Sequence, residues 1–184
     1  MPTLGKFDVI VSRMEARQLL LLAGLLAYPE EASYAVLVEV AATDAPWLAA
    51  ALPELQAIAL DAWQGEHTRL FINGFPKTIC PPFESVWRHG CMAGAAAEQL
   101  SILYQQAGLE WFGGSAPDYL GVILECVAYC LTTSDDSLQS VLEQLVTDHL
   151  RLWVPTFAAT LSRETDLVLY RLLGEQLQKL FGDP

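Results

Sequence analysis

Apolar side chains recur every three or four residues along most of the chain, and this spacing predicts amphipathic helices. The helical stretches cover residues 13–27, 31–42, about 48–63, about 91–107, 118–132, 137–152 and about 164–181. Pro29 and Pro46 separate the first three stretches, and Pro53 denies the third a regular first turn. The sequence contains neither an alternating strand pattern nor an internal repeat. The pattern therefore predicts an all-α protein, a single-domain helical bundle of about 8–10 helices over residues 1–184.

Glycine, proline and short polar side chains mark the expected helix ends. Gly108 follows the stretch 91–107, where a C-terminal glycine cap is expected. Ser115 stands three residues before Asp118, which is the spacing of a capping box with Asp in place of Glu. Pro117 fits the first turn of the same helix. The sequence therefore predicts that Ser115 caps the start of this helix.

The longest irregular segment covers residues 72–90 and joins two helical halves. Pro81 and Pro82 forbid a regular helix at that point, and the stretch after them combines large apolar side chains with charges. Loops of this length inside compact domains are more often functional than idle. We therefore expect a long, ordered, proline-rich connection in the middle of the chain. The alternative is a plain crossover connection packed by its own aromatic side chains.

The predicted helix over residues 118–132 has two different faces. The apolar face carries Leu120, Ile123, Leu124, Val127 and Leu131. The opposite face carries Asp118, Gly121, Glu125, Tyr129 and Thr132. Glycine costs about 1 kcal/mol relative to alanine inside a helix, so Gly121 predicts either a close backbone approach or a cleft. A purely structural alternative also exists, in which Asp118 caps the helix, Glu125 pairs with an arginine, and Gly121 permits a tight helix crossing.

Composition narrows the classes of function. Hydrophobic residues make up 53% of the 184 residues, which leaves apolar surface for a partner beyond what one core hides. The net charge is −12 with only 10 Lys and Arg residues, which argues against nucleic-acid binding. The N-terminal stretch lacks the pattern of a secretory signal, and the most apolar early run is too short to span a bilayer. A cytoplasmic protein without stable membrane insertion is expected.

Catalytic and metal-binding patterns are missing from the sequence. The four cysteines match no zinc spacing, and the three histidines are scattered. No phosphate-binding glycine loop, nucleophile elbow or zinc-protease motif occurs. We therefore expect neither an enzyme nor a bound cofactor or metal. Two alternatives stay open: a helical protein that binds a metal or small molecule with its cysteines and Glu125, and a general helical adaptor.

Three segments together resemble the TorD/DmsD/NarJ-type chaperones of molybdoenzymes. EHTRLFINGF followed by PPFESVWR is similar to the YxxLF…G…PPxxSVY region of that family. APDYLGVILECVAYCL is similar to its EPxDHxGxxLEFMAxL segment. DHLRLWVPTFAATL and VLYRLLGEQLQKLF resemble its HLxxWxPxF and FYRxLAxLLxxF patterns. The resemblance covers residues 15–181, and the order and spacing of the motifs make it specific.

The resemblance implies a single all-helical redox enzyme maturation chaperone. Members of the family bind the N-terminal region of a molybdoenzyme catalytic subunit, often a twin-arginine signal peptide. They hold that subunit in the cytoplasm until its cofactor is inserted, before export or assembly. The twin-arginine export machinery is a further candidate partner, and both a monomer and a domain-swapped dimer are compatible with the long connection.

The resemblance and the helix faces together define the expected peptide-binding residues. By motif position these are Leu70, Phe71, Pro82, Ser85, Val86, Trp87 and Asp118. The neighbouring residues added to the set are Phe83, Tyr119, Gly121 and Glu125. Tyr119 stands where the family usually has His, and His67 stands where a bulky aromatic is frequent, so a different client sequence is plausible. The pattern assigns Glu84 no clear position beyond an ion pair to a client arginine.

Overall fold

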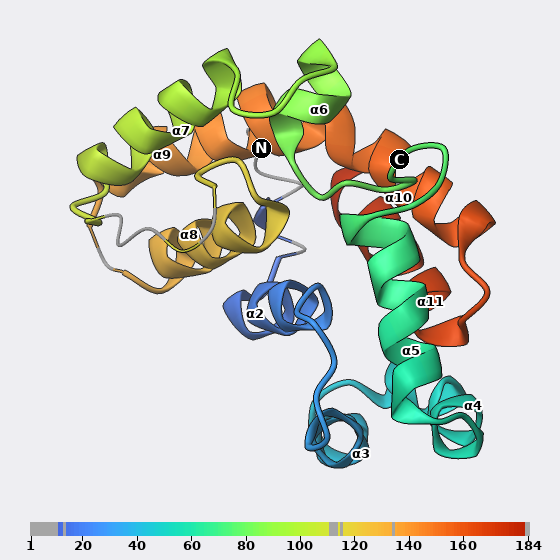
Figure 1. Cartoon of the computed structure of the whole chain (residues 1–184). Helices are drawn as coiled ribbons and strands as arrows, with labels where there is room; N and C mark the ends of the chain where they lie inside the picture. Colours follow the sequence, from blue (N-terminus) through green and yellow to red (C-terminus); the bar gives the residue numbers. More distant parts are fainter. Residues whose placement is uncertain (1–10, 13, 111–113, 115, 134, 183–184) are drawn as a thin grey trace. The chain divides into compact units, whose positions relative to one another are not determined.

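The computed structural model describes residues 11–12, 14–110, 114, 116–133 and 135–182. Every regular element among these residues is a helix, as Figure 1 shows. Within the described residues, the only β-type pairing is an isolated antiparallel bridge between Phe83 and Tyr119. The prediction of an all-α fold is confirmed. None of the described helices is long and apolar enough to cross a membrane.

The chain folds into two compact units, and each unit combines segments that are distant in sequence. The first unit contains Met1–Leu26, Pro82–Pro155 and Leu177–Pro184, as far as these segments are described. The second unit contains Ala27–Pro81 and Thr156–Gln176. The boundary between the two units therefore falls between Pro81 and Pro82. The single domain over residues 1–184, with a connection joining two halves, stays a prediction.

The first unit is built around the helix that carries the apolar stripe. Its helices are α2 (Ala16–Leu25), α6 (Glu84–His89), α7 (Ala95–Gln106), α8 (Leu120–Thr132), α9 (Leu138–Gln144), η3 (Leu145–Leu150), the beginning of α10 (Arg151–Glu164) and the end of α11 (Val168–Phe181). Helix α8 packs against α2 (Figure 1). Four of the five predicted stripe residues are fully buried, namely Leu120, Ile123, Leu124 and Val127. The 3.6-residue period therefore identified the core face of α8 correctly.

The second unit contains a cluster of buried aromatic side chains. Its helices are α3 (Ser33–Thr43), η1 (Pro46–Ala50), α4 (Leu52–Ala57), α5 (Leu60–His67), η2 (Thr68–Ile72) and the remaining parts of α10 and α11. The stretch 48–63, predicted as one helix, is instead divided among η1, α4 and α5. Pro53 is the second residue of α4, where a missing N–H is tolerated. The break comes at Ile58 and Ala59, which adopt extended backbone angles that no proline or glycine in the sequence indicates.

Two further predictions of helix ends need correction. Residues 84–89 were expected to be irregular but form helix α6, which ends at Gly90 with a φ of 73°. Helix α8 begins at Leu120 rather than at a capping box, because Asp118 bonds to another segment. Ser115 itself lies outside the described residues. The glycine cap after α7 is present, since Gly108 has a φ of 72°.

A buried carboxylate ties the segments of the second unit together. Glu66 in α5 accepts two hydrogen bonds from the Arg69 guanidinium, at 2.7 and 2.9 Å. It also accepts bonds from the Thr165 hydroxyl and the Asp166 N–H, at 3.1 and 2.9 Å. Burial alone raises the pKa of Glu66, but these donors together outweigh burial and hold the pKa below its usual value. The ionised carboxylate therefore links α5 to the turn between α10 and α11.

Replacing Glu66 with glutamine is expected to reduce the free energy of unfolding by about 2 kcal/mol at neutral pH, because charge-assisted hydrogen bonds are lost. The folded pKa of Glu66 lies below its unfolded value of 4.5. The stabilisation is therefore fully present above that pH and disappears as the pH falls through the folded pKa. Urea unfolding of both proteins across this range should show a difference that shrinks on acidification.

The matched control is Glu175→Gln, which removes an exposed carboxylate from α11 in the same unit. It should leave the free energy of unfolding nearly unchanged at every pH. A deficit of Glu66→Gln that is the same at neutral and acidic pH would contradict the assigned role of the charge.

Candidate functional site

The proline-rich segment is joined to the start of α8 by main-chain hydrogen bonds. The Leu120 N–H donates to the Pro82 carbonyl at 2.8 Å, and the Glu84 N–H donates to the Asp118 carbonyl at 3.0 Å. Phe83 and Tyr119 form the isolated bridge between these two bonds. The structure therefore brings the proline-rich segment and the start of α8 side by side, although they are far apart in the sequence.

Hydrogen bonds of two buried residues, Asp118 and Ser85, hold the start of α6 in place. Both side chains are fully buried. Asp118 Oδ2 accepts the Ser85 N–H at 3.0 Å, so the carboxylate from the α8 segment does the work of an N-cap for α6. Ser85 Oγ in turn accepts the Gly94 N–H at 3.1 Å, which ties down the turn before α7. The position of both residues is explained by the fold, and their part in peptide binding stays a prediction.

Glu84 is the important residue that sequence reasoning failed to place. Its carboxylate is fully buried and lies 2.9 and 3.0 Å from His149 Nδ1 in η3. Arg88, one turn later in α6, donates to the same carboxylate and to the Asp148 carbonyl. An ionised carboxylate only accepts hydrogen bonds, so a contact between ionised Glu84 and His149 requires the hydrogen on Nδ1 of the ring. The i, i+4 spacing of Glu84 and Arg88 was a usable signal. His149 is the histidine of the HLxxWxPxF pattern, but nothing in the sequence connected it to Glu84.

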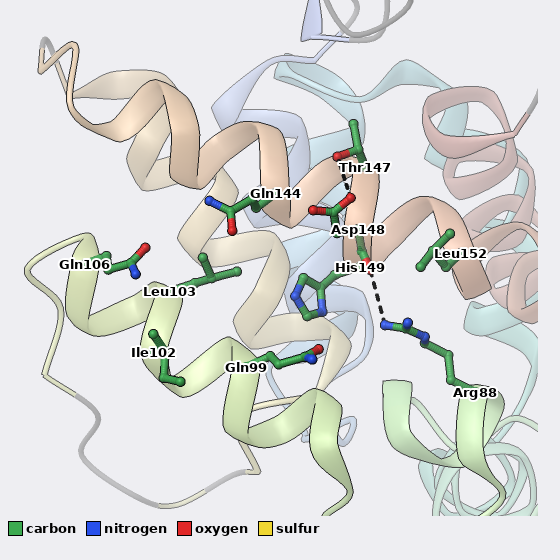
Figure 2. A pocket seen from close by; sticks show the side chains of 10 residues that line it. All are labelled: Arg88, Gln99, Ile102, Leu103, Gln106, Gln144, Thr147, Asp148, His149 and Leu152. Carbon is green, nitrogen blue, oxygen red and sulfur yellow. Dashed lines mark hydrogen bonds between the residues drawn. The ribbon is translucent and has the colours of Figure 1, made fainter.

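A polar groove opens beside this buried pair (Figure 2). Its volume is about 520 Å³, and its walls come from α6, α7, α9, η3 and α10. The lining residues are Arg88, Gln99, Ile102, Leu103, Gln106, Gln144, Thr147, Asp148, His149 and Leu152. Three glutamine amides alternate with two half-exposed apolar side chains, Ile102 and Leu152. Together with the exposed charges of Arg88 and Asp148, this surface offers donors and acceptors for polar groups.

The predicted apolar surface is partly accessible. Phe83, Val86 and Trp87 are each neither buried nor fully exposed, whereas Pro82 is buried. The rings of Phe83 and Tyr119 lie 5.6 Å apart, so they form one continuous aromatic surface. Phe83 precedes α6, while Val86 and Trp87 lie on it, and the bonds of Glu84 and Ser85 hold that helix in place. This aromatic surface is therefore mounted on a rigid base.

Tyr119 explains the unusual glycine of α8. Its hydroxyl donates to the Leu26 carbonyl at the end of α2, at 3.1 Å. Its ring covers Gly121, where a Cβ atom would lie only 2.6 Å from ring carbon Cε1. The feature that requires a glycine is thus an aromatic ring, neither a second backbone nor a cleft. Burial and the nearby Glu125 charge raise the pKa of Tyr119 to about 12.

Glu125 remains at the surface. It is exposed on α8 and lines a smaller pocket of about 250 Å³ together with Tyr104, Cys126 and Tyr129. The polar stripe predicted for this helix is therefore confirmed for Glu125, Tyr129 and Thr132, which are all exposed.

Leu70 and Phe71 belong to the second unit and lie inside it. Both are buried, and the Phe71 ring contacts His67, Tyr170 and Phe157 with centroid distances of 5.0, 5.2 and 6.4 Å. His67 is buried in the same aromatic cluster, so it fills the place where the family frequently has a bulky aromatic. Leu70 and Phe71 therefore serve the core of their unit, and their contact with a peptide stays a prediction.

The cysteines do not assemble a recognisable site. Cys80 is buried, and its desolvation raises the pKa of its thiol to about 12. Hydrogen bonding to Cys130 and burial raise the pKa of Cys126, one turn earlier on α8. Cys91 is exposed. Within the described part of the chain, no three metal-ligating side chains come close enough to hold an ion.

Comparison with known proteins identifies the family. The family model described as nitrate reductase delta subunit matches residues 37–159, which is more than half of the chain. No curated protein matches the sequence. Among solved structures, the crystal structure of a candidate redox enzyme maturation protein from Archaeoglobus fulgidus is similar, with a TM-score of 0.65 and 22% sequence identity. The match covers 92% of this chain and 95% of that one, so the two proteins share a fold.

The family model and the shared all-helical fold agree with the motif resemblance. The chain belongs to the nitrate reductase delta subunit family, the TorD/DmsD/NarJ-type chaperones that mature redox enzymes and are not themselves catalysts.

Proposed function

We propose that this protein binds the N-terminal segment or twin-arginine signal of a molybdoenzyme catalytic subunit in the cytoplasm. It holds that subunit until the cofactor is inserted and folding is complete, before export or assembly. The observation that carries this proposal is the aromatic surface of Phe83, Val86, Trp87 and Tyr119 on a rigid base, at the motif that the chain shares with its family.

The energetics favour the apolar contacts as the source of affinity. An apolar segment that buries about 400 Å² gains roughly 10 kcal/mol gross. Ordering the peptide removes several kcal/mol and leaves an affinity near micromolar. Exposed ion pairs add at most about 1 kcal/mol each. Carboxylates such as Glu125 therefore set the orientation of the peptide rather than its affinity.

Holding the apolar side chains of α6 in place before the peptide arrives increases affinity, because less conformational entropy is lost on binding. Glu84 and Asp118 are both fully buried, so neither carboxylate is available to a client arginine in this conformation. Their part in recognition is indirect, because they hold α6 and its apolar side chains in one arrangement. Ser85 and Gly121 act in the same indirect way: Ser85 bonds to Asp118 and to the turn before α7, and Gly121 leaves room for the Tyr119 ring.

Capture of the client tests the function directly. The intact protein, expressed with a molybdoenzyme catalytic subunit, is expected to co-purify with that subunit, as identified by mass spectrometry. Deleting the N-terminal segment of the subunit should abolish the capture. Capture that survives this deletion would contradict the proposed binding of the N-terminal segment.

A peptide titration tests the site. Trp87→Ala is expected to weaken binding of a client N-terminal peptide about 10-fold, because it removes apolar contact area from the proposed surface. Isothermal titration calorimetry measures the change in Kd, and thermal unfolding of the variant should match that of the wild-type chain. Ile102→Ala is the matched control, since it removes an exposed apolar side chain from the polar groove of the same unit. A loss with Ile102→Ala and none with Trp87→Ala would place the peptide in the groove instead.

A further inference from the structure

The second unit contains a long span without any basic residue. No Lys or Arg occurs between Arg17 and Arg69. The same span contains seven acidic residues, Glu30, Glu31, Glu39, Asp44, Glu54, Asp61 and Glu66. Helices α3, α4 and α5 all come from this span. Glu66 is buried and paired with Arg69, and the other six carboxylates have no basic side chain within this span to neutralise them.

A pocket of about 340 Å³ opens on this acidic surface. Its floor is apolar and includes Leu55 and Ile58 of the α4 end and Trp63 of α5. Tyr34 of α3 forms a side wall and is half-buried. The charged groups that line it are two exposed carboxylates, Glu30 and Glu31. The pocket thus combines apolar walls with an acidic rim.

The walls of this pocket are fixed before any ligand arrives. Trp63 is only 6% exposed, and its indole N–H donates to the Tyr170 hydroxyl at 3.0 Å, which sets the orientation of the ring. Next to the lining residues Trp63 and Glu30 in the sequence, the Gln64 amide donates to the Pro29 carbonyl at 2.8 Å. The Glu30 N–H donates to Ser33 Oγ at 2.8 Å. A preformed pocket loses less entropy on binding than a flexible one.

The carboxylates on the rim are available to a ligand. Across the described residues, no ion pair is recorded for Glu30 or Glu31. A cation placed against the apolar wall gains from both carboxylates, and its aliphatic stem packs on the floor as the stems of Arg and Lys do on apolar surfaces. An aromatic side chain beside a cation adds further attraction. An anionic ligand is repelled by the same charges, and so is the matching acidic surface of a second copy.

We propose that this pocket takes an arginine or lysine side chain that stands beside apolar residues in the N-terminal segment of the client. Val38, one turn after Tyr34 on α3, is 41% exposed and extends the apolar surface for those neighbours. The inference rests on the proposed function for the identity of the partner. It adds a second recognition surface, on the second unit, that reads the basic residues of that partner.

Two peptides and two variants of the full chain test the proposal. One peptide carries two arginines followed by an apolar segment, and the other has glutamine in place of both arginines. Calorimetry at low salt should show the wild-type protein binding the arginine peptide about 10-fold more tightly. The double variant Glu30→Gln/Glu31→Gln should lose this preference while still binding the glutamine peptide as the wild type does.

The control variant Glu39→Gln/Asp61→Asn removes the same charge from exposed positions of α3 and α5 outside the pocket. It should keep the preference for arginine. An equal loss in both variants would mean that only the net charge matters, and a preference kept by Glu30→Gln/Glu31→Gln would overturn the pocket assignment alone. Failure of both peptides to bind the wild-type protein would overturn the peptide-binding function together with this inference.

Discussion

Two buried carboxylates determine how the central motif is presented. Asp118 holds the first turn of α6, and Glu84, on that turn, bonds to His149. A buried carboxyl group is costly unless it is hydrogen-bonded, so removing the Ser85 N–H from Asp118 or His149 from Glu84 leaves a buried polar group with fewer partners. The cost restricts α6 to one position, and the orientation of its apolar side chains follows from that restriction.

This arrangement separates the buried supporting residues from the accessible side chains that we propose for recognition. Fully buried residues of the motif, such as Ser85 and Asp118, form the base, while Phe83, Val86 and Trp87 remain at least partly accessible. A chaperone that acts by binding needs such a surface to be ready before the client arrives, because each side chain that must be ordered on binding reduces the affinity. The acidic pocket of the second unit follows the same rule, since a buried hydrogen bond fixes Trp63 in its wall.

The two departures from the family pattern are accommodated by different means. His67 joins an aromatic cluster and is buried within it, so the substitution is absorbed by packing. Tyr119 gains a hydrogen bond to the end of α2 and covers Gly121. A side chain at position 121 would meet this ring, so Tyr119 and Gly121 pack directly against each other. The departure at position 119 is therefore tied to the packing of the first unit.

From the sequence alone, the helical class, the core stripe of α8 and the segments of the central motif could be determined, because apolar periodicity and proline are local signals. The breaks at Ile58 and Ala59, the late start of α8 and the role of Glu84 could not. Asp118 has the spacing of a local cap, but its carboxylate bonds to a residue 33 positions away. Such partners are chosen by packing between distant segments. Only the tertiary structure decided them, because the hydrogen bond that satisfies a buried charge carries no pattern along the chain.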